Sequence, residues 1–179
     1  FSRCSSDRDK AVAWLKKAAD TGHADAQVKL GDVYLTAAVV DEDDDLAMEL
    51  YPKAAAQGDA AGQYSVGWMY ENGVAVTTDY LEAKKWYELA AKQDYILAIT
   101  HLADLYYGGK GVAQDYPKSQ TYYQQAADLG SGYGYSSLGD LYEKGYGVAK
   151  DASKAVAYYR KGAELGDCDG LYNMGSINE

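Results

Sequence analysis

The chain has 179 residues, of which 47% are hydrophobic and only two are proline, so its composition is not that of a disordered protein. Seventeen lysines and arginines against 27 aspartates and glutamates give a net charge of −10, and without a basic stripe the chain is a poor partner for nucleic acid or anionic lipid. No apolar run approaches the roughly 20 residues needed to cross a bilayer, so no membrane insertion of this segment is expected.

The predicted elements repeat at a step of 36 residues without insertion or deletion. This register predicts one all-α solenoid over 1–179, built of stacked helix pairs. Its units are about 24–59, 60–95, 96–131 and 132–167, with partial units 1–23 and 168–179. The positions that keep the step are Gly31, Gly67, Ala103, Gly139 and Gly175; Tyr34, Tyr70, Tyr106 and Tyr142; Leu15, Tyr51, Tyr87, Tyr123 and Tyr159; and Asp43, Asp79, Asp115 and Asp151.

The partial unit 1–23 begins with Phe1 rather than Met, which favours an exported or periplasmic location over a cytoplasmic one. A signal peptide, a lipid anchor or another domain before Phe1 stays open. Cys4 follows Arg3, which is a poor residue before a lipidated cysteine. Cys4 and Cys168 lie at opposite ends of the predicted solenoid and out of phase with the repeat, so we expect no disulfide between them.

The unit 24–59 departs from the repeat in two places. The acidic run Asp41 to Asp45 replaces the glycine-rich loop, and as a calcium-binding loop it would lack the required Gly and Glu. It is interpreted as a solvated loop, with an electrostatic contact for a basic partner as the functional alternative. Pro52 falls inside the predicted second helix and should kink it.

The unit 60–95 predicts one helix pair clearly. A helical stripe of apolar and small residues over Ala60 to Asn72 ends at Gly73, which can take a left-handed cap. Asp79 then caps the second helix. Asp94 stands where glycine ends the second helix of three other units, at Gly58, Gly130 and Gly166.

In the unit 132–167, the stretch "GYGVAKD" from Gly145 to Asp151 has glycine spacing that a phosphate-binding loop could also use. A phosphate loop follows a strand, whereas here a helix precedes the glycines and the loop recurs at Gly73 and Gly109. The stretch is therefore interpreted as the turn between two helices.

No other pattern of residues indicates chemistry. His23 falls in a turn and His101 on the edge of a first helix, and neither has a Ser or Cys placed to form a triad. Both are interpreted as surface histidines. We predict no catalytic, metal-binding or cofactor-binding residue, no cofactor, and a chain that is not itself an enzyme.

Segments such as "LGDLYEKGYGVAKDASKAVAYYRKGAELG" and "VGWMYENGVAVTTDYLEAKKWYELAAKQD" follow the pattern "AxxxLGxxYxxGxGVxxDxxKAxxYYxKAAxxG". The chain therefore resembles the Sel-1-like repeat family, helical relatives of the tetratricopeptide repeat, over about Asp9 to Gly175. The resemblance implies an α/α superhelical solenoid whose first helices line a concave groove. It also implies an adaptor or scaffold, as in bacterial signalling, secretion and host contact, or in eukaryotic membrane-protein quality control.

Residues of the first helices that point away from the predicted core stripe are the candidates for a protein-binding groove. Trp68 stands where other units have aspartate, and it is either a binding anchor or a side chain packed on the neighbouring repeat. Trp68→Ala is expected to leave the fold intact and to weaken binding by about 2 kcal/mol. The candidates are Val28, Asp32, Leu35, Tyr64, Trp68, Glu71, Leu97, Thr100, Asp104, Tyr107, Tyr133, Ser136, Asp140 and Glu143.

These residues lead to the expectation of a scaffold or adaptor, monomeric when free, whose groove binds a basic protein segment with at least one apolar side chain. Carboxylates in the groove would steer a cationic partner. Two alternatives stay open. The chain is a bacterial immunity-type protein that neutralises a toxin, or it is the regulatory domain of an enzyme whose catalytic part lies outside this sequence.

Overall fold

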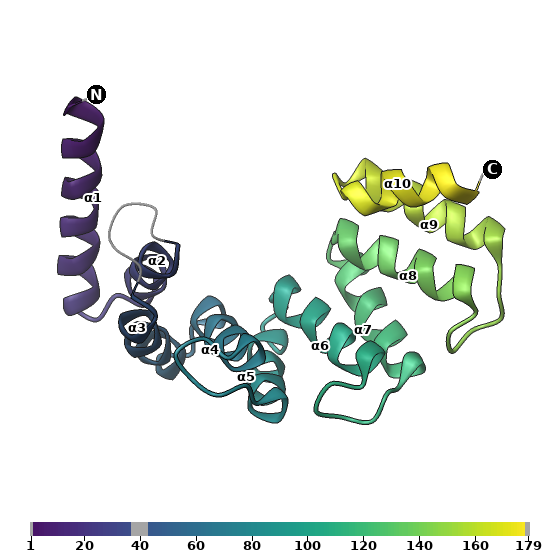
Figure 1. Ribbon diagram of the computed structural model, residues 1–179, viewed down its shortest axis with the longest axis horizontal. Coiled ribbons are helices and arrows are strands. Elements are labelled where there is room, and N and C mark those ends of the chain that lie inside the picture. Colours follow the sequence, from purple (N-terminus) through teal and green to yellow (C-terminus); the bar gives the residue numbers. More distant parts are fainter. Residues whose placement is uncertain (1, 37–42, 178–179) are drawn as a thin grey trace. The chain divides into compact units, whose positions relative to one another are not determined.

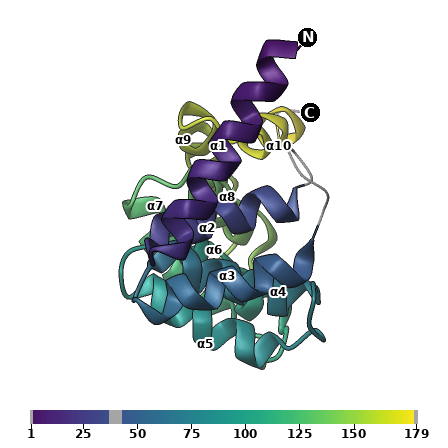
Figure 2. The ribbon, with the colours of Figure 1, turned by 90° about the vertical axis from the view of Figure 1, so that its left-hand side faces the viewer.

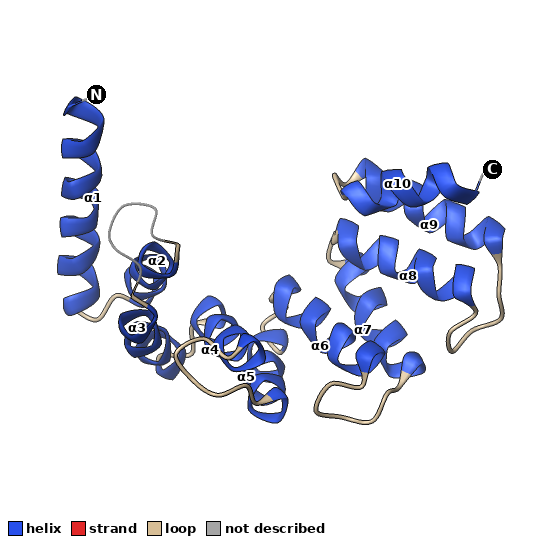
Figure 3. Cartoon of the chain, in the orientation of Figure 1, coloured by secondary structure: helices blue, strands red, loops and turns tan. Residues whose placement is uncertain are grey.

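The computed structural model describes residues 2–36 and 43–177, without the side chains of 2–9, 171 and 174–177. The described residues form ten α-helices joined by short loops, and they include no strand (Figure 3). This confirms the all-α fold predicted from the sequence. The helices are α1 (Ser2–Asp20), α2 (Ala24–Leu35), α3 (Asp44–Ala56), α4 (Ala60–Asn72), α5 (Tyr80–Ala91), α6 (Ile96–Gly108), α7 (Tyr116–Asp128), α8 (Gly132–Lys144), α9 (Ala152–Glu164) and α10 (Cys168–Ile177).

The chain divides into two compact units, unit 1 over Phe1–Tyr95 and unit 2 over Ile96–Glu179. In unit 1 each helix packs against the next, and α1 lies across α2 (Figures 1 and 2). One buried cluster joins the C-terminal part of α1 to α2 and consists of Val12, Ala19, Ala26 and Leu30. A second cluster, called here the unit 1 core, joins α2, α3 and α4 and consists of Val28, Ala47, Tyr51, Ala54, Ala55, Val66 and Met69.

In unit 2 the helices α6 to α10 also pack in sequence, and α10 touches α8 as well as α9 (Figure 1). The buried cluster of this unit is formed by Ala103, Tyr123, Ala127, Leu138 and Leu141. Both units therefore bury small residues and one tyrosine of each of the helices α3, α5, α7 and α9, as the predicted stripes require.

The helix ends follow the predicted caps. Gly73 ends α4 in the left-handed region with φ 70°, and Gly145 ends α8 with φ 75°. The Asp79 carboxylate accepts hydrogen bonds from the backbone N–H of Leu81 and Glu82 at 3.0 Å. Asp94, which replaces a glycine, also takes a left-handed φ of 56°. The "GYGVAKD" stretch is thus a helix–helix turn, as predicted.

Pro52 and the acidic run are the two unusual features of the unit 24–59. Pro52 lies inside α3, which runs on to Ala56, so the proline does not end the helix. Asp41 and Glu42 of the acidic run lie outside the described residues. Asp43 caps α3, because its carboxylate accepts the backbone N–H of Leu46 at 3.0 Å.

Neighbouring helices approach each other closely where a glycine faces the backbone of the preceding helix. A Cβ added at Gly62 of α4 would lie 2.9 Å from the Ala55 backbone nitrogen in α3. In unit 2, a Cβ at Gly134 of α8 would lie 2.9 Å from the Ala127 nitrogen in α7. Gly62 in unit 1, and Gly134 and Gly170 in unit 2, thus occupy the same repeat position and bring neighbouring helices into contact.

Candidate protein-binding surface

One tyrosine of each second helix is buried, and its hydroxyl donates to a carboxylate on the first helix of the same pair. These four tyrosines are at most 3% exposed. Since a buried hydroxyl without a partner is destabilising, the carboxylates satisfy a structural need. The bonds are Tyr51 to Asp32 at 2.8 Å, Tyr87 to Glu71 at 2.7 Å, Tyr123 to Asp104 at 2.5 Å, and Tyr159 to both Asp140 and Glu143 at 2.6 Å.

Burial and the neighbouring carboxylates raise the pKa of three of these tyrosines. Burial first, and then the hydrogen bond and charge of Asp32, raise the pKa of Tyr51 far above its ordinary value. Burial likewise raises the pKa of Tyr123 and of Tyr159, with their carboxylate partners adding to the effect. The acidic row of the first helices is therefore a set of acceptors for buried hydroxyls, which the sequence analysis did not predict.

Trp68 interrupts this acidic row, and the structure shows how the repeat adjusts. The residue one turn later, Glu71, accepts the hydroxyl of Tyr87 in place of an aspartate at position 68. Trp68 itself is half-buried and packs against the unit 1 core. Of the two alternatives for Trp68, the packing role is therefore present in the structure. Trp68→Ala would therefore remove contacts with the unit 1 core, and its effect on the fold stays a prediction.

Three of the candidates do not point outward. Val28, Thr100 and Ser136 occupy the same repeat position as Tyr64 and are 8%, 5% and 4% exposed. The fourth residue of this series, Tyr64, is half-buried. The Ser136 hydroxyl lies against Gly162 of α9 and Gly170 of α10, two residues that have no Cβ, so neighbouring helices cover it. These three residues are therefore corrected from surface to interior.

The remaining candidates of unit 1, called here the first-helix face of unit 1, are Asp32, Leu35, Tyr64, Trp68 and Glu71. Asp32 is exposed, and the other four are half-buried. The Tyr64 ring stacks on Tyr87 at a centroid distance of 5.7 Å and contacts Tyr95 at 5.4 Å. Burial, followed by the charges of Tyr95 and Glu71, raises the pKa of Tyr64 to about 12. This face combines carboxylates with aromatic rings.

The first-helix face of unit 2 consists of Leu97, Asp104, Tyr107, Tyr133, Asp140 and Glu143. Leu97 is 49% exposed and Tyr133 is 41% exposed, so apolar surface reaches the solvent here. The Tyr133 hydroxyl donates to Asp104 at 3.0 Å, which holds the ring over the acidic row. Lys144 lies 3.4 Å from Asp140 and 3.5 Å from the Tyr107 hydroxyl, so one cation already shares this face.

Among the described side chains, no group of three or more His, Cys, Asp or Glu residues is placed to hold a metal ion. The His23 Nδ1 lies 3.0 Å from the Thr21 hydroxyl in an exposed turn, and His101 is half-buried on α6. Cys168 is a free, exposed thiol, whereas the side chain of Cys4 lies outside the described part. No described helix is both long and apolar enough to span a bilayer.

The family model for the Sel1 repeat matches residues 2–23, 24–59, 60–95, 96–131 and 133–167. A comparison with curated proteins gave no match. Among solved structures, the chain is similar to a Sel1 repeat protein from Oxalobacter formigenes, with 32% sequence identity and a TM-score of 0.88 over 95% of this chain and 69% of that one.

Two immunity proteins from Pseudomonas aeruginosa, Pa5087 and PA5088, are also similar to this chain. Their sequence identities are 25% and 27%, and both have a TM-score of 0.66. The similarity covers 92% of this chain in both cases, 61% of Pa5087 and 60% of PA5088, so this chain spans less than two thirds of their length.

Proposed function

Because the chain belongs to the Sel1 repeat family, whose members are protein-interaction scaffolds, we propose that it is a non-enzymatic scaffold that binds a basic protein segment. The proposed contacts are the first-helix faces of unit 1 and of unit 2. The observation that carries this proposal is the exposed Tyr133 ring beside Asp104 in unit 2. An exposed aromatic ring supplies apolar contact area, and the adjacent carboxylate favours a cation.

The electrostatics of this face support a basic partner. A hydrogen bond from a tyrosine hydroxyl fixes the position of the carboxylate that accepts it. Asp140 and Glu143 are held in this way by one hydroxyl of Tyr159. Preorganised acceptors of this kind lose little side-chain entropy on binding, and the negative field of a chain with a net charge of −10 raises the association rate of a cation.

A peptide-display selection against the immobilised full chain tests the proposal. We expect enriched peptides to contain Lys or Arg together with an apolar residue, and their affinity to fall with rising salt. Tyr133→Ala should weaken the binding of these peptides by about 1–2 kcal/mol, as measured by titration calorimetry. Leu81→Ala is the matched control, since Leu81 is 56% exposed on α5 and lies outside both first-helix faces. Enrichment of neutral peptides, or equal losses for both variants, would contradict the proposal.

The similarity to two immunity proteins favours a second candidate, in which the partner is a toxin that this chain neutralises. The same surface would then cover the active site of the toxin. The two candidates differ in one measurement: the catalytic activity of a captured partner, with and without a stoichiometric amount of this chain. Inhibition that Tyr133→Ala relieves supports the immunity function, and full activity of the bound partner supports the scaffold.

A further inference from the structure

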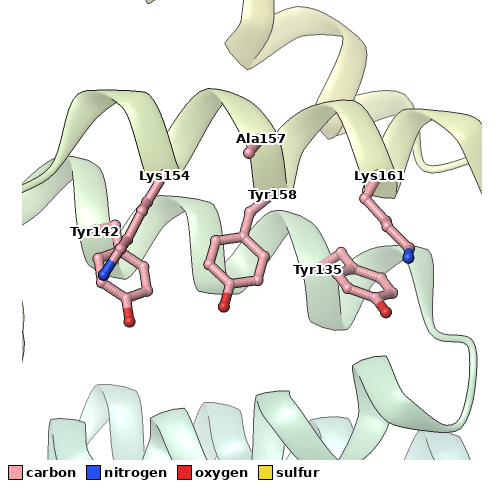
Figure 4. Close-up of a pocket in the computed structure, with 6 residues that line it drawn as sticks. All are labelled: Tyr135, Tyr142, Lys154, Ala157, Tyr158 and Lys161. Carbon is pink, nitrogen blue, oxygen red and sulfur yellow. The ribbon is translucent and has the colours of Figure 1, made fainter.

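A pocket of about 360 Å³ lies between α8 and α9 of unit 2, away from the residues proposed above. Its lining, shown in Figure 4, consists of Tyr135, Tyr142, Lys154, Ala157, Tyr158 and Lys161. We call it the tyrosine–lysine pocket. Its side chains were not among the candidates from the sequence, although Tyr142 belongs to a series at the 36-residue step.

The aromatic rings of the pocket form a row with a cation at each end. Tyr158 stacks on Tyr142 at a centroid distance of 5.5 Å and lies 6.4 Å from Tyr135. The Lys154 Nζ lies 5.1 Å from the centre of the Tyr142 ring, and the Lys161 Nζ lies 5.3 Å from that of Tyr135. In Figure 4 the three tyrosine hydroxyls point to the same side, and the two amino groups lie at opposite ends of the row.

The charge of the pocket is opposite to that of the chain. Both lysines are exposed, the lining has no carboxylate, and neither lysine forms an ion pair with a described residue. Burial raises the pKa of Tyr158, and the charges of Tyr142, Tyr135 and Asp128 of α7 add to this effect in that order. Asp128 accepts a hydrogen bond from Gln124. Two unpaired cations in a chain with a net charge of −10 mark this pocket as a site for an anion.

One half of this arrangement occurs one repeat earlier in unit 2, without the second lysine, since Ile99 and Gln125 stand at the positions of Tyr135 and Lys161. Tyr106 of α6 stacks on Tyr122 of α7 at 5.8 Å, and the Lys118 Nζ lies 4.2 Å from the centre of the Tyr106 ring. These residues precede Tyr142, Tyr158 and Lys154 by 36 positions. Unit 1 has a different set, because Glu82 and Trp86 of α5 occupy the equivalent positions and Glu82 pairs with Lys85. The lysine–tyrosine arrangement is therefore a property of the surface of unit 2 and not a requirement of the repeat.

We propose that the tyrosine–lysine pocket binds an acidic segment of a partner protein. Lys154 and Lys161 are two helical turns apart, so their Cα atoms are separated by about 10 Å. In an extended segment alternate side chains face the same way, and residues four apart lie about 13 Å from each other. Flexible lysine side chains can reach both ends of such a spacing. The matching sequence is therefore acidic–x–apolar–x–acidic, with the apolar side chain on the Tyr158 ring.

The distance between the two cations distinguishes this ligand from a small anion. A phosphate or a single carboxylate would need both amino groups at one centre, whereas they lie at opposite ends of the row (Figure 4). A segment with two separated carboxylates contacts both lysines and also covers the apolar ring faces between them. The lysines already lie over aromatic rings, so part of the entropy lost on fixing them has been lost before binding.

Amide chemical-shift titration of the full chain tests the proposal with a synthetic peptide, acetyl-Gly-Glu-Ser-Leu-Ser-Glu-Gly-amide. We expect saturable shifts that cluster on α8 and α9, with a dissociation constant below about 1 mM. The same peptide with Gln in place of both Glu residues should produce much smaller shifts. Combining Lys154→Gln with Lys161→Gln should weaken binding at least about fivefold. Combining Lys92→Gln with Lys150→Gln is the matched control, since both of these lysines are exposed outside the pocket.

Several results would overturn the proposal: no shifts, shifts outside α8 and α9, equal binding of the Gln peptide, or an equal loss in the control variant. Because Lys154 and Lys161 are exposed, their replacement should not change the helical circular dichroism spectrum. If the spectrum changes, the variant that combines Lys154→Arg with Lys161→Arg replaces the Gln variant in the test. It keeps both positive charges and should therefore still bind the peptide. The basic peptides of the previous section contact other residues, so the two proposals can fail separately.

Discussion

Unit 1 and unit 2 build the same helix pairs, but within each unit the carboxylate that accepts the buried tyrosine hydroxyl does not stand at one position throughout. In unit 1 the acceptor is Asp32 in one repeat and Glu71, one turn further along the helix, in the next. In unit 2, Asp104 serves Tyr123, whereas Asp140 and Glu143 share Tyr159. The repeat therefore requires a carboxylate within reach of the hydroxyl and not a carboxylate at one position. This freedom is what allows Trp68 to occupy the aspartate position.

The two units differ more at the surface than in the interior. The buried tyrosine and the close approach at glycine occur in both, since stacking helices at short distance requires them. The lysine–tyrosine arrangement occurs in unit 2, whereas unit 1 has Glu82 and Trp86 at the equivalent positions. Side chains that the packing leaves free are where the units acquire different binding properties.

Replacing the glycine at a close helix–helix contact should destabilise both units. Gly62→Ala and Gly134→Ala each place a methyl group 2.9 Å from a backbone nitrogen, which cannot rotate away, so we expect each to lower the free energy of unfolding by about 1–3 kcal/mol. Urea denaturation measures the loss. Gly108→Ala is the control, because its nearest neighbour would be 3.6 Å away.

A stable Gly134→Ala variant would contradict this reading of unit 2. Two other repeats, those with Ala26 and Ala98, have alanine at the position equivalent to Gly134. Unchanged stability would mean that the α7–α8 pair can adjust its spacing to admit a methyl group. A loss in one unit and none in the other would show that the two units pack differently at this position.

Two carboxylates of unit 2 share the Tyr159 hydroxyl, which predicts that the loss of one glutamate destabilises the two units by different amounts. Glu71→Ala should remove the bond to Tyr87 and lower the free energy of unfolding by about 1–2 kcal/mol. Glu143→Ala should have a smaller effect, below about 1 kcal/mol, because Asp140 still accepts the Tyr159 hydroxyl. The double variant with Asp140→Ala and Glu143→Ala should lose about as much free energy of unfolding as Glu71→Ala. Glu164→Ala at an exposed site of α9 is the control, and equal effects of Glu71→Ala and Glu143→Ala would disprove the sharing.

High pH should affect both units alike and should have no effect near neutrality. In the unfolded chain tyrosine ionises at a pKa of about 10, whereas Tyr64 in the folded chain has a pKa of about 12. A group whose pKa is higher in the folded chain than in the unfolded chain stabilises the fold. This contribution is fully present below the pKa of the unfolded chain and is lost as the pH rises through the pKa of the folded chain. Stability should therefore fall above about pH 10.

Urea denaturation at increasing pH, together with phenolate absorbance, checks this expectation. The pKa of Tyr51 in unit 1 and that of Tyr159 in unit 2 are both raised, so late-ionising tyrosines should be found in each. Tyr159→Phe should reduce the pH dependence by the contribution of one residue. If all tyrosines ionised together at the pKa of the free amino acid, the hydroxyl–carboxylate bonds would not exist in solution.

The sequence alone determined the elements of this protein. The 36-residue step predicted helix pairs, and Gly73 and Asp79 placed the end of α4 and the start of α5 at the residues where the structure has them. These features are local, since a left-handed cap and an N-cap depend on the residue itself and its nearest neighbours. The same locality explains why the turn at Gly145 to Asp151 could be distinguished from a phosphate loop.

Only the tertiary structure decided what the outward side chains do. At 100° per residue the helical wheel assigned Thr100 and Ser136 to the surface. In the structure both side chains are buried, and Ser136 is covered by neighbouring helices. The hydrogen bond from Tyr133 to Asp104 and the row of rings between Lys154 and Lys161 each join two helices. Such contacts depend on how helices stack, which a periodicity along one helix does not contain.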